Sequence, residues 1–294
     1  MVAPPLADVR DQWDGVSAGW ADWLDAFERG GAAVTDRLMR LAGSQPGARV
    51  LDVGTGLGEP ALTVARAVGP TGTVTGIDVS GEMIRRARER AGGVANLEFV
   101  ESDPESLRPG IRFDAVLARW SLMFSPDRIA TLRAVRRLLR PGGVLAAAVW
   151  APPAEAPIVS LAFPVLTERL RLPPPPPDQP GPYAMSDPRR CVSELTGAGF
   201  TEVSVTPLAA PFWMASPAEY TRFARDVLPG RFRRMLCERF GSVDDPDTWA
   251  GVERRAAALT GAPGRVDLTS TVLCLRGRAP ATPSRNTTPS RNGR

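Results

Sequence analysis

Apolar runs and helical patterns alternate along the chain between residues 49 and 150. Short runs rich in β-branched residues precede longer segments with apolar positions three and four apart, which is typical of βαβ units and a parallel sheet. The short runs predict strands at 49–53, 73–78, 97–101, 113–118 and 144–150. The longer segments predict helices at 59–68, 81–91 and 127–139. The pattern therefore indicates an α/β fold.

Turn signals and a later continuation of the pattern support this interpretation. Gly69-Pro70, Gly92-Gly93 and Pro141-Gly142-Gly143 follow the predicted helices, and such residues end helices and turn the chain. Further along, we expect a helix at 189–198 and strands at 202–206 and 270–276. The seven strands predict a Rossmann-like sheet with helices on both faces.

The remaining segments suggest a division of the chain. Residues 1–48 form an N-terminal helical segment or lid, and residues 49–206 form the core, with a proline-rich connection at 151–187. Residues 207–267 form a substrate-side insertion, and the last core strand lies within 268–278. We expect residues 279–294 to be disordered, because the repeated Thr-Pro-Ser-Arg-Asn offers no apolar surface to bury.

The most informative stretch is the turn after the first predicted strand, which reads Asp52-Val53-Gly54-Thr55-Gly56-Leu57-Gly58-Glu59-Pro60. Glycines at such a turn let the backbone approach a ligand at a helix N-terminus. The sixth position counted from Gly54 is Glu59, so the loop does not match the G-x-G-x-x-G pattern of dinucleotide-binding proteins. Its acids would repel a pyrophosphate and suit a ligand with a cationic amino-acid end.

Acids also end the second and third predicted strands. Asp78 lies twenty residues after Gly58, where a carboxylate accepts hydrogen bonds from ribose hydroxyls. Asp103 follows the third strand at the same edge of the sheet, where it would meet an adenine amino group. A ribose, an adenine and a cationic amino-acid end together describe S-adenosylmethionine.

Residues 49–150 resemble the class I S-adenosylmethionine-dependent methyltransferases. The resemblance rests on the glycine loop and on the phrases Asp78-Val79-Ser80-Gly81-Glu82-Met83, Phe113-Asp114-Ala115-Val116 and Leu138-Leu139-Arg140-Pro141-Gly142-Gly143. The chain is similar in particular to the ubiquinone/menaquinone-biosynthesis-like branch, whose members methylate small molecules. The resemblance implies a mostly parallel seven-stranded sheet whose last strand is antiparallel.

The resemblance also implies roles for individual residues. Asp52, Gly54 and Gly56 would hold the methionine end of the cofactor, Asp78 the ribose, Met83 one adenine face and Asp103 the adenine amino group. Arg119 and Trp120 would face cofactor or substrate. The full predicted set of cofactor residues is Asp52, Gly54, Thr55, Gly56, Gly58, Asp78, Val79, Met83, Ser102, Asp103, Pro104, Arg119 and Trp20, the last as a lid residue. Pro104 stands where the family has a small residue, and it lacks an N–H for adenine.

Composition limits the available catalytic groups. The chain contains 36 basic residues, all of them arginine, and no histidine. Histidine-based acid–base catalysis and lysine Schiff bases are therefore excluded. The candidates for a substrate-side catalytic role are Tyr183, Tyr220 and Arg119, and Trp150, Phe212, Trp213 and Met214 would supply an apolar wall.

Charge and targeting signals favour a cytoplasmic enzyme of small molecules. The net charge is +4, and it falls to +1 without the three arginines of the tail, so we expect no nucleic-acid partner. No apolar run approaches the ~18 residues of a membrane span, and the cysteines have no metal-site spacing. We expect no membrane association, no metal, and a monomer or homodimer.

These observations predict a methyltransferase that uses S-adenosyl-L-methionine on a small, partly apolar molecule in secondary metabolism. In-line transfer would proceed with little or no general-base help. Two alternatives remain open. One is an enzyme of the same fold that catalyses a cyclisation, a rearrangement or aminocarboxypropyl chemistry. The other is a non-catalytic regulatory protein that binds the cofactor.

Overall fold

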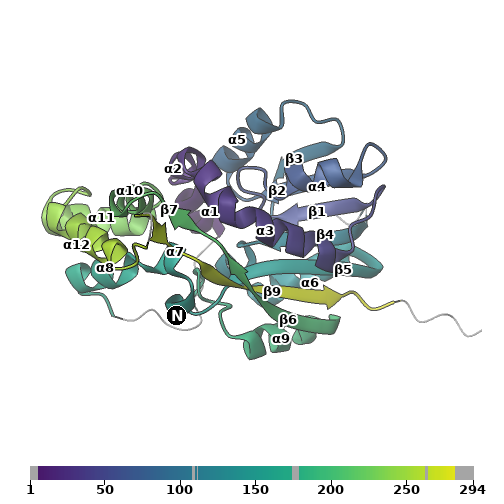
Figure 1. Cartoon of the computed structure of the whole chain (residues 1–294). Helices are drawn as coiled ribbons and strands as arrows, with labels where there is room; N and C mark the ends of the chain where they lie inside the picture. The colour runs from purple at the N-terminus through teal and green to yellow at the C-terminus, as the bar shows by residue number, and fades with distance from the viewer. Residues whose placement is uncertain (1–5, 108–109, 111, 174–178, 262–263, 282–294) are drawn as a thin grey trace, which may run out of the picture.

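The computed structural model describes residues 6–107, 110, 112–173, 179–261 and 264–281 (Figure 1). Residues 174–178 of the proline-rich connection and residues 282–294 of the predicted disordered tail lie outside the described residues. Among the described helices, none combines the length and apolar character that a membrane span requires.

A seven-stranded sheet forms the centre of the molecule, in the order β3-β2-β1-β4-β5-β9-β6. Strands β1 to β5 pair in parallel, and β9 is antiparallel to both of its neighbours. This arrangement confirms the predicted fold class. The strands are β1 (Arg49–Val53), β2 (Thr73–Asp78), β3 (Leu97–Glu101), β4 (Phe113–Arg119), β5 (Leu139–Trp150), β6 (Thr201–Ala210) and β9 (Ser270–Arg278).

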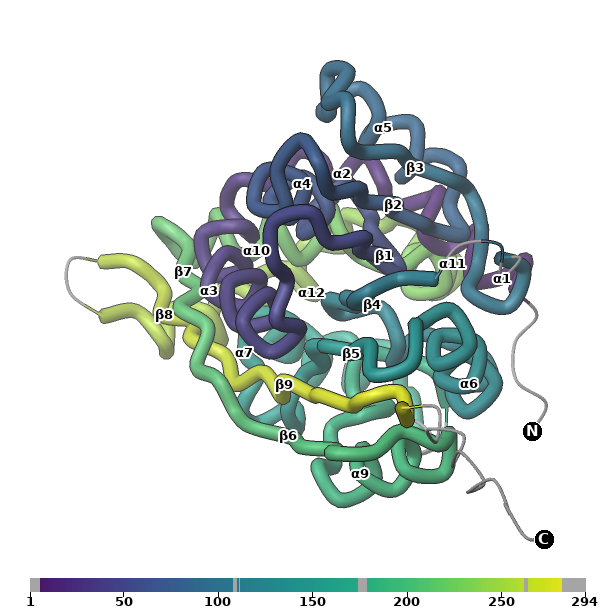
Figure 2. Tube along the Cα trace, turned by 90° about the vertical axis from the view of Figure 1, so that its right-hand side faces the viewer, coloured from purple at the N-terminus to yellow at the C-terminus, as the bar shows by residue number. Residues whose placement is uncertain are grey.

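Helices cover both faces of this sheet, and Figure 2 shows α3 and α4 on one side with α6 and α9 on the other. Right-handed crossovers explain the division, since β1, β2 and β3 follow one another in one direction and β4 lies on the opposite side of β1. The reversal creates a switch point between β1 and β4, where open α/β sheets bind ligands. The covering helices are α1 (Leu6–Asp14), α2 (Ser17–Asp22), α3 (Leu24–Ala42), α4 (Ala61–Val68), α5 (Gly81–Ala91), α6 (Arg128–Leu138) and α9 (Pro188–Gly197).

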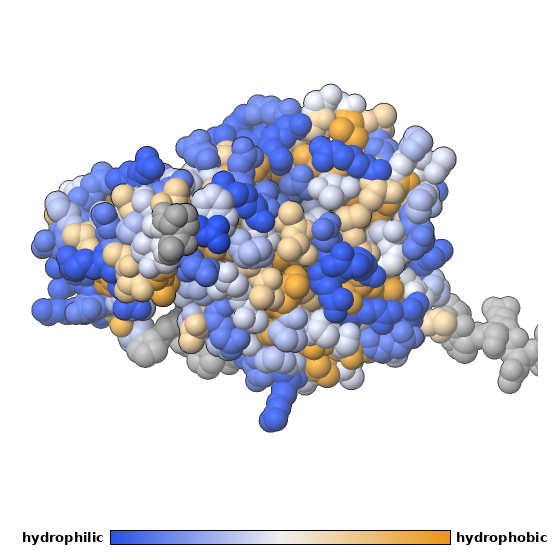
Figure 3. Space-filling view, viewed as in Figure 1, coloured by the Kyte–Doolittle hydropathy of each residue, from blue (hydrophilic) through white to orange (hydrophobic). Residues whose placement is uncertain are grey.

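A group of helices, here called the helical lobe, lies beyond the carboxyl ends of β4 and β5, at the left in Figure 1. It consists of α8 (Phe163–Leu170), α10 (Pro217–Asp226), α11 (Gly230–Phe240) and α12 (Pro246–Ala257). Hydrophilic side chains cover much of this lobe on the face shown in Figure 3. The shorter connecting elements are η1 (Leu122–Phe124), η2 (Pro153–Glu155), α7 (Pro157–Ser160), β7 (Trp213–Met214) and β8 (Val266–Asp267).

Local side-chain chemistry explains why the core helices begin and end where they do. The Ser80 hydroxyl accepts a hydrogen bond from the Met83 amide at the start of α5, over 3.0 Å. The Asp127 carboxylate accepts one from Ala130 at the start of α6, over 2.9 Å. Gly92 ends α5 in the left-handed region, with φ of 57°. Side-chain caps and a terminal glycine of this kind are readable in sequence.

Several predicted bounds differ from the structure for a visible reason. β5 begins at Leu139 instead of 144, because Leu139 already pairs with Phe113 before a register shift over the proline–glycine turn. α4 begins at Ala61 instead of 59, after Pro60 as its N-cap residue. β6 extends to Ala210, because antiparallel pairing with β9 continues to Ser270. β1, β2, β3 and α5 have the predicted bounds.

Candidate active site

The glycine loop after β1 forms the floor of the site at the switch point. Gly54, Gly56 and Gly58 all have positive φ, the conformation that glycine adopts without strain. A Cβ on Gly54 would lie 2.2 Å from the Cβ of Ser121, so no side chain fits there. A Cβ on Gly56 would meet nothing within 4 Å, so the backbone at Gly56 borders open space. The loop therefore offers a ligand direct access to its backbone.

Asp52, at the carboxyl end of β1, is completely buried. Its Oδ2 accepts a hydrogen bond from the Ala61 amide over 3.2 Å. Its Oδ1 and the nearby Thr55 hydroxyl are both buried without a well-aligned hydrogen bond to a described residue, so Thr55 is the neighbour that competes with a ligand for this oxygen. Burial raises the pKa of Asp52 to about 7, although the nearby Thr55 hydroxyl and Arg119 guanidinium act in the opposite direction. A buried carboxylate with a free acceptor fits a cationic ligand group, which would restore its ionised form.

Asp78, at the end of β2, ties the glycine loop to its neighbouring strand. Its two carboxylate oxygens accept hydrogen bonds from the amides of Gly56, over 2.9 Å, and Ser80, over 3.0 Å. Burial still raises the pKa of Asp78 to about 6. Each carboxylate oxygen can accept more than one hydrogen bond, so both retain capacity for ribose hydroxyls.

Helix α1 lies across the end of β2 and the start of α5. The Asp14 carboxylate accepts hydrogen bonds from the Ser80 hydroxyl and the Glu82 amide, and Arg10 donates to the carbonyl of Val79 over 3.0 Å. Our sequence interpretation assigned no contact to Arg10 or Asp14, because they lie more than 60 residues from their partners. The N-terminal segment thus packs beside the predicted ribose site.

The predicted adenine residues lie after β3 and on α5. Met83 is buried in the first turn of α5. Asp103 accepts hydrogen bonds from the amide and hydroxyl of Ser106, over 2.8 and 2.7 Å. Burial acts to raise the pKa of Asp103, but these bonds outweigh it and leave that pKa lowered. Ser102 donates to the Asp103 carbonyl over 3.2 Å, and Pro104 is buried.

Arg119, predicted to face cofactor or substrate, pairs with an acid of α3. Its guanidinium donates to both carboxylate oxygens of Glu28, one of them at 2.8 Å, and to the Thr35 hydroxyl at 3.0 Å. Its side chain is 6% exposed. Glu28 was not among our candidates, because 91 residues separate it from Arg119 and no local motif marks it.

Aromatic side chains gather over the carboxyl ends of β4 and β5. The Trp120 ring stacks on that of Trp150, with centroids 4.6 Å apart and planes 11° apart. Phe27 and Phe212 pack against both rings. Trp20 contacts Phe27 with centroids 5.0 Å apart, so the predicted lid residue joins this cluster. We call Phe27, Trp120, Trp150 and Phe212 the aromatic wall.

The apolar wall that we predicted from sequence needs one correction. Trp150, Phe212 and Met214 are buried as expected, but Trp213 is only partly buried. Its ring lies between two cations, 4.3 Å from the Arg29 guanidinium and 5.4 Å from that of Arg265. Because alternate residues of a strand point to opposite sides, Trp213 faces away from its buried neighbours.

Tyr220 lies on α10 with its ring against Phe223, and Tyr183 lies between α8 and α9 with its ring against Phe163. Tyr220, on α10, is almost completely buried, and burial raises its pKa while the Ala162 backbone acts in the opposite direction. Burial also raises the pKa of Tyr183. Since both phenols stay protonated at neutral pH, their environment does not favour a role as general base.

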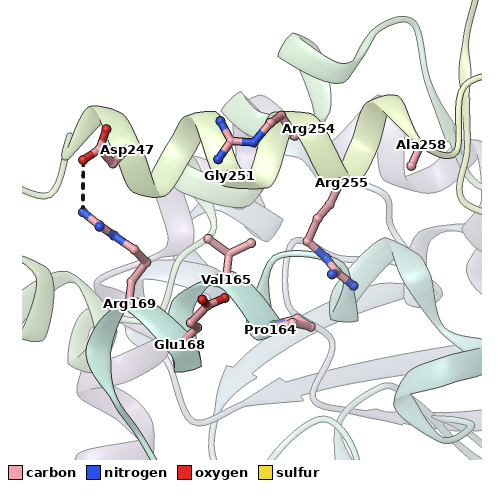
Figure 4. Close-up of a pocket in the computed structure, with 9 residues that line it drawn as sticks. All are labelled: Pro164, Val165, Glu168, Arg169, Asp247, Gly251, Arg254, Arg255 and Ala258. Atoms are coloured by element: carbon pink, nitrogen blue, oxygen red, sulfur yellow. Dashed lines mark ion pairs between the residues drawn. The ribbon is translucent and has the colours of Figure 1, made fainter.

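A groove lies between α8 and α12, away from the glycine loop (Figure 4). It has a volume of about 600 Å³ and contains none of the predicted site residues. Arg169 from α8 reaches toward Asp247 of α12 across it, at 3.7 Å. Its remaining lining residues are Pro164, Val165, Glu168, Gly251, Arg254, Arg255 and Ala258.

Comparison with known proteins finds relatives of the region around the glycine loop. Residues 50–143 match the methyltransferase domain family. A demethylmenaquinone methyltransferase from Staphylococcus aureus strain JH9 is 36% identical over 110 residues, which are 37% of this chain and 46% of that protein. The chain spans about half the length of the curated relatives that it matches.

Solved structures show a similar fold over most of the chain. A protein from Haloferax volcanii, solved with the Trm112 methyltransferase activator, aligns with a TM-score of 0.56 at 19% identity, over 93% of this chain and 98% of that one. The [4+2]-cyclase SpnF aligns with a TM-score of 0.50 at 22% identity, over 85% and 82%. At these identities the likeness concerns the fold alone.

The sheet, the glycine loop and the acidic strand ends define a Rossmann-like protein with a site for a cofactor that carries a cation. Residues 50–143 match the methyltransferase domain family, and S-adenosylmethionine is the cofactor that suits this site. The fit is physical as well, since Asp52 offers a free buried acceptor and Gly56 borders open space.

Proposed function

We propose that the protein transfers the methyl group of S-adenosylmethionine to a small, partly apolar molecule. The observation that carries this proposal is the aromatic wall, which adjoins the cofactor site through Arg119 and Trp120 at the end of β4. Trp120 is the one member of this wall that is only partly buried, so its indole is the member that could contact a substrate ring. The name of the Staphylococcus aureus relative points to a quinone ring, and we extend only that chemical class to this chain.

The residues of the chain would hold the cofactor in a defined orientation. Asp52 and the loop backbone would bind the amino-acid end, Asp78 the ribose, and Met83 and Asp103 the adenine. When bound, S-adenosylmethionine supplies a methyl group that is already electrophilic. The protein then has to align the acceptor atom with the methyl–sulfur bond and exclude water.

The proton balance restricts the acceptor. The bond from the acceptor to the methyl group forms as the sulfur–carbon bond breaks, and S-adenosylhomocysteine leaves with the electron pair. The chain has no histidine or lysine, and burial keeps both tyrosines protonated. We therefore propose an acceptor that is an acidified carbon, an amine that binds neutral, or a group that loses its proton to solvent or a carboxylate.

A second candidate function uses the same site without methyl transfer. The fold is shared with the cyclase SpnF, and a site without a conventional base is compatible with a cyclisation or rearrangement. The mass of the product separates the two. A gain of one CH₂ together with S-adenosylhomocysteine supports methyl transfer, and an unchanged mass supports isomerisation.

The experiment is an assay of the purified protein with S-adenosylmethionine and a panel of quinones, phenols, amines and activated carbon acids. S-adenosylhomocysteine and product mass are measured together. The expected result is stoichiometric formation of both with an apolar ring compound. Tight cofactor binding without either product across the panel would support the third possibility, a non-catalytic cofactor-binding protein in a role of regulation.

A further inference from the structure

Arg119 occupies a buried position where its charge requires a partner. It lies two residues after Leu117, which pairs in register with Asp52 across β4 and β1. Alternate residues of a strand share a face, so Arg119 and Asp52 lie on the same face of the sheet. The Arg119 guanidinium also donates to the carbonyl of Glu59 over 3.3 Å, in the loop that leads from Asp52 to α4.

Arg119 nevertheless forms no ion pair with Asp52 in the structure. The guanidinium makes its ion pair with Glu28, while Oδ1 of Asp52 has no well-aligned hydrogen bond to a described residue. A buried arginine and a buried carboxylate on one face of a sheet would ordinarily pair, because leaving either charge unpaired is costly. Glu28 therefore takes the cation that Asp52 would otherwise attract.

Helix α3 is shaped to allow this pairing. A Cβ on Gly31 would lie 2.8 Å from Nη1 of Arg119, so a side chain there would displace the guanidinium. The preceding Gly30 similarly makes room for the Phe212 ring, which a Cβ would approach to 2.5 Å. Glycine inside a helix is less favourable than alanine, so two glycines in a row need a packing reason. The pair of glycines keeps a notch open for Arg119 and for the aromatic wall.

We propose that Glu28 is a positioning residue that holds Arg119 away from Asp52 and so leaves Asp52 free for the cationic end of the cofactor. The proposal rests on the cofactor assignment of the proposed function. Arg119 and the cofactor ammonium are competitors for one buried carboxylate, and Glu28 decides the competition. Helix α3, outside the matched methyltransferase domain, thereby contributes to cofactor affinity.

Burial has the largest effect on the pKa of Asp52, and charged groups around the carboxylate act on it as well. Arg119 from β4 lowers its pKa, Glu59 from the glycine loop raises it, and Glu28 from α3 acts by neutralising Arg119. Removing the charge of Glu28 exposes Asp52 to the full field of Arg119. Removing Arg119 has the opposite effect. The two substitutions must therefore move the titration of Asp52 in opposite directions.

The test is calorimetric titration of the full chain with S-adenosylmethionine between pH 5.5 and 9. Glu28→Gln should weaken binding about tenfold at pH 8, because Arg119 turns to Asp52. The midpoint of the pH dependence should move to lower pH. Arg119→Gln should move that midpoint to higher pH. In the Arg119→Gln background, Glu28→Gln should cause no further loss of affinity.

Asp36→Asn is the matched control, since Asp36 is an exposed acid on the same helix. It should bind like the unmodified protein. The proposal is overturned if Glu28→Gln behaves like this control, if its midpoint moves to higher pH, or if it weakens binding equally with and without Arg119.

A second measurement works without the cofactor. The melting temperature of the ligand-free protein should fall between pH 5 and 8 as the buried Asp78 and Asp52 are forced to ionise, and the part due to Asp52 should be smaller in Glu28→Gln. If the unmodified protein binds no S-adenosylmethionine, the proposed function fails. An unchanged fall in Glu28→Gln contradicts the role of Glu28 alone.

Discussion

Two regions of the molecule are built on different principles: the region of the cofactor site, here called the cofactor half, and the region that we propose to hold the substrate, here called the substrate half. The cofactor half consists of strand ends, glycines and carboxylates, all within about a hundred residues that match a known domain family. The substrate half consists of aromatic rings and arginine-rich helices brought together from both ends of the chain. The first region is therefore marked by local sequence signals, whereas the second depends on packing between distant segments.

Substitution of Asp52 should cause the largest loss of cofactor binding. Asp52→Asn removes the charge that would pair with the cofactor ammonium, so cofactor binding should weaken about 100-fold. Titration calorimetry at pH 8 measures the loss, with Asp114→Asn as a control on the neighbouring strand. Binding within threefold of the unmodified protein would show that Asp52 is structural.

The pH dependence of binding should follow the same carboxylate. Burial places the pKa of Asp52 at about 7, so the ionised form that binds a cation increases as pH rises through 7. The dissociation constant of S-adenosylmethionine should therefore fall about tenfold from pH 6 to pH 8. Asp52→Asn should show a much flatter profile. Affinity that decreases over this range would contradict the assignment.

Two glycine substitutions compare a packed notch with an open helix surface. Gly31→Ala places a methyl group against Arg119 and should lower the free energy of unfolding by about 1–3 kcal/mol. Gly197→Ala, in α9, meets nothing within 4 Å and should raise it by about 0.5–1 kcal/mol. Urea denaturation measures both. If both substitutions raise the free energy of unfolding, or both lower it, Gly31 is not needed to make room for Arg119.

The substrate half should be insensitive to loss of its phenols. Tyr183→Phe and Tyr220→Phe keep the ring and remove a hydroxyl whose pKa is raised by burial. Since neither phenol is suited to accept a proton, kcat with an identified acceptor should change less than about threefold. The pH profile of kcat should keep its shape. A profile that loses an inflection in either variant would restore that tyrosine as a base.

The same difference explains which features could be predicted from the sequence. β1, β2 and β3 were predicted with their observed bounds, because buried strands, glycine turns and strand-end acids are local signals. Asp52, Gly56 and Asp78 meet at one edge because parallel strands bring their carboxyl ends together. That consequence follows from topology alone.

The contacts that cross between segments could not be read from the chain. Glu28 and Arg119 are 91 residues apart, and the indole of Trp23 donates to Asp226 across 203 residues. Such pairs depend on how α3 packs on the sheet and how α10 packs against α2, which no local pattern specifies. From the sequence we could predict only the types of residue on the substrate side. The structure was needed to show which of them contact one another.

The most direct test of the central claim is calorimetric titration of the unmodified protein with S-adenosylmethionine at pH 8, alongside Asp78→Ala. We expect saturable binding of one cofactor per chain, with clearly weaker binding in Asp78→Ala because the ribose and the glycine loop lose a shared carboxylate. Absence of binding heat in the unmodified protein, confirmed by an unchanged melting temperature with excess cofactor, would contradict it.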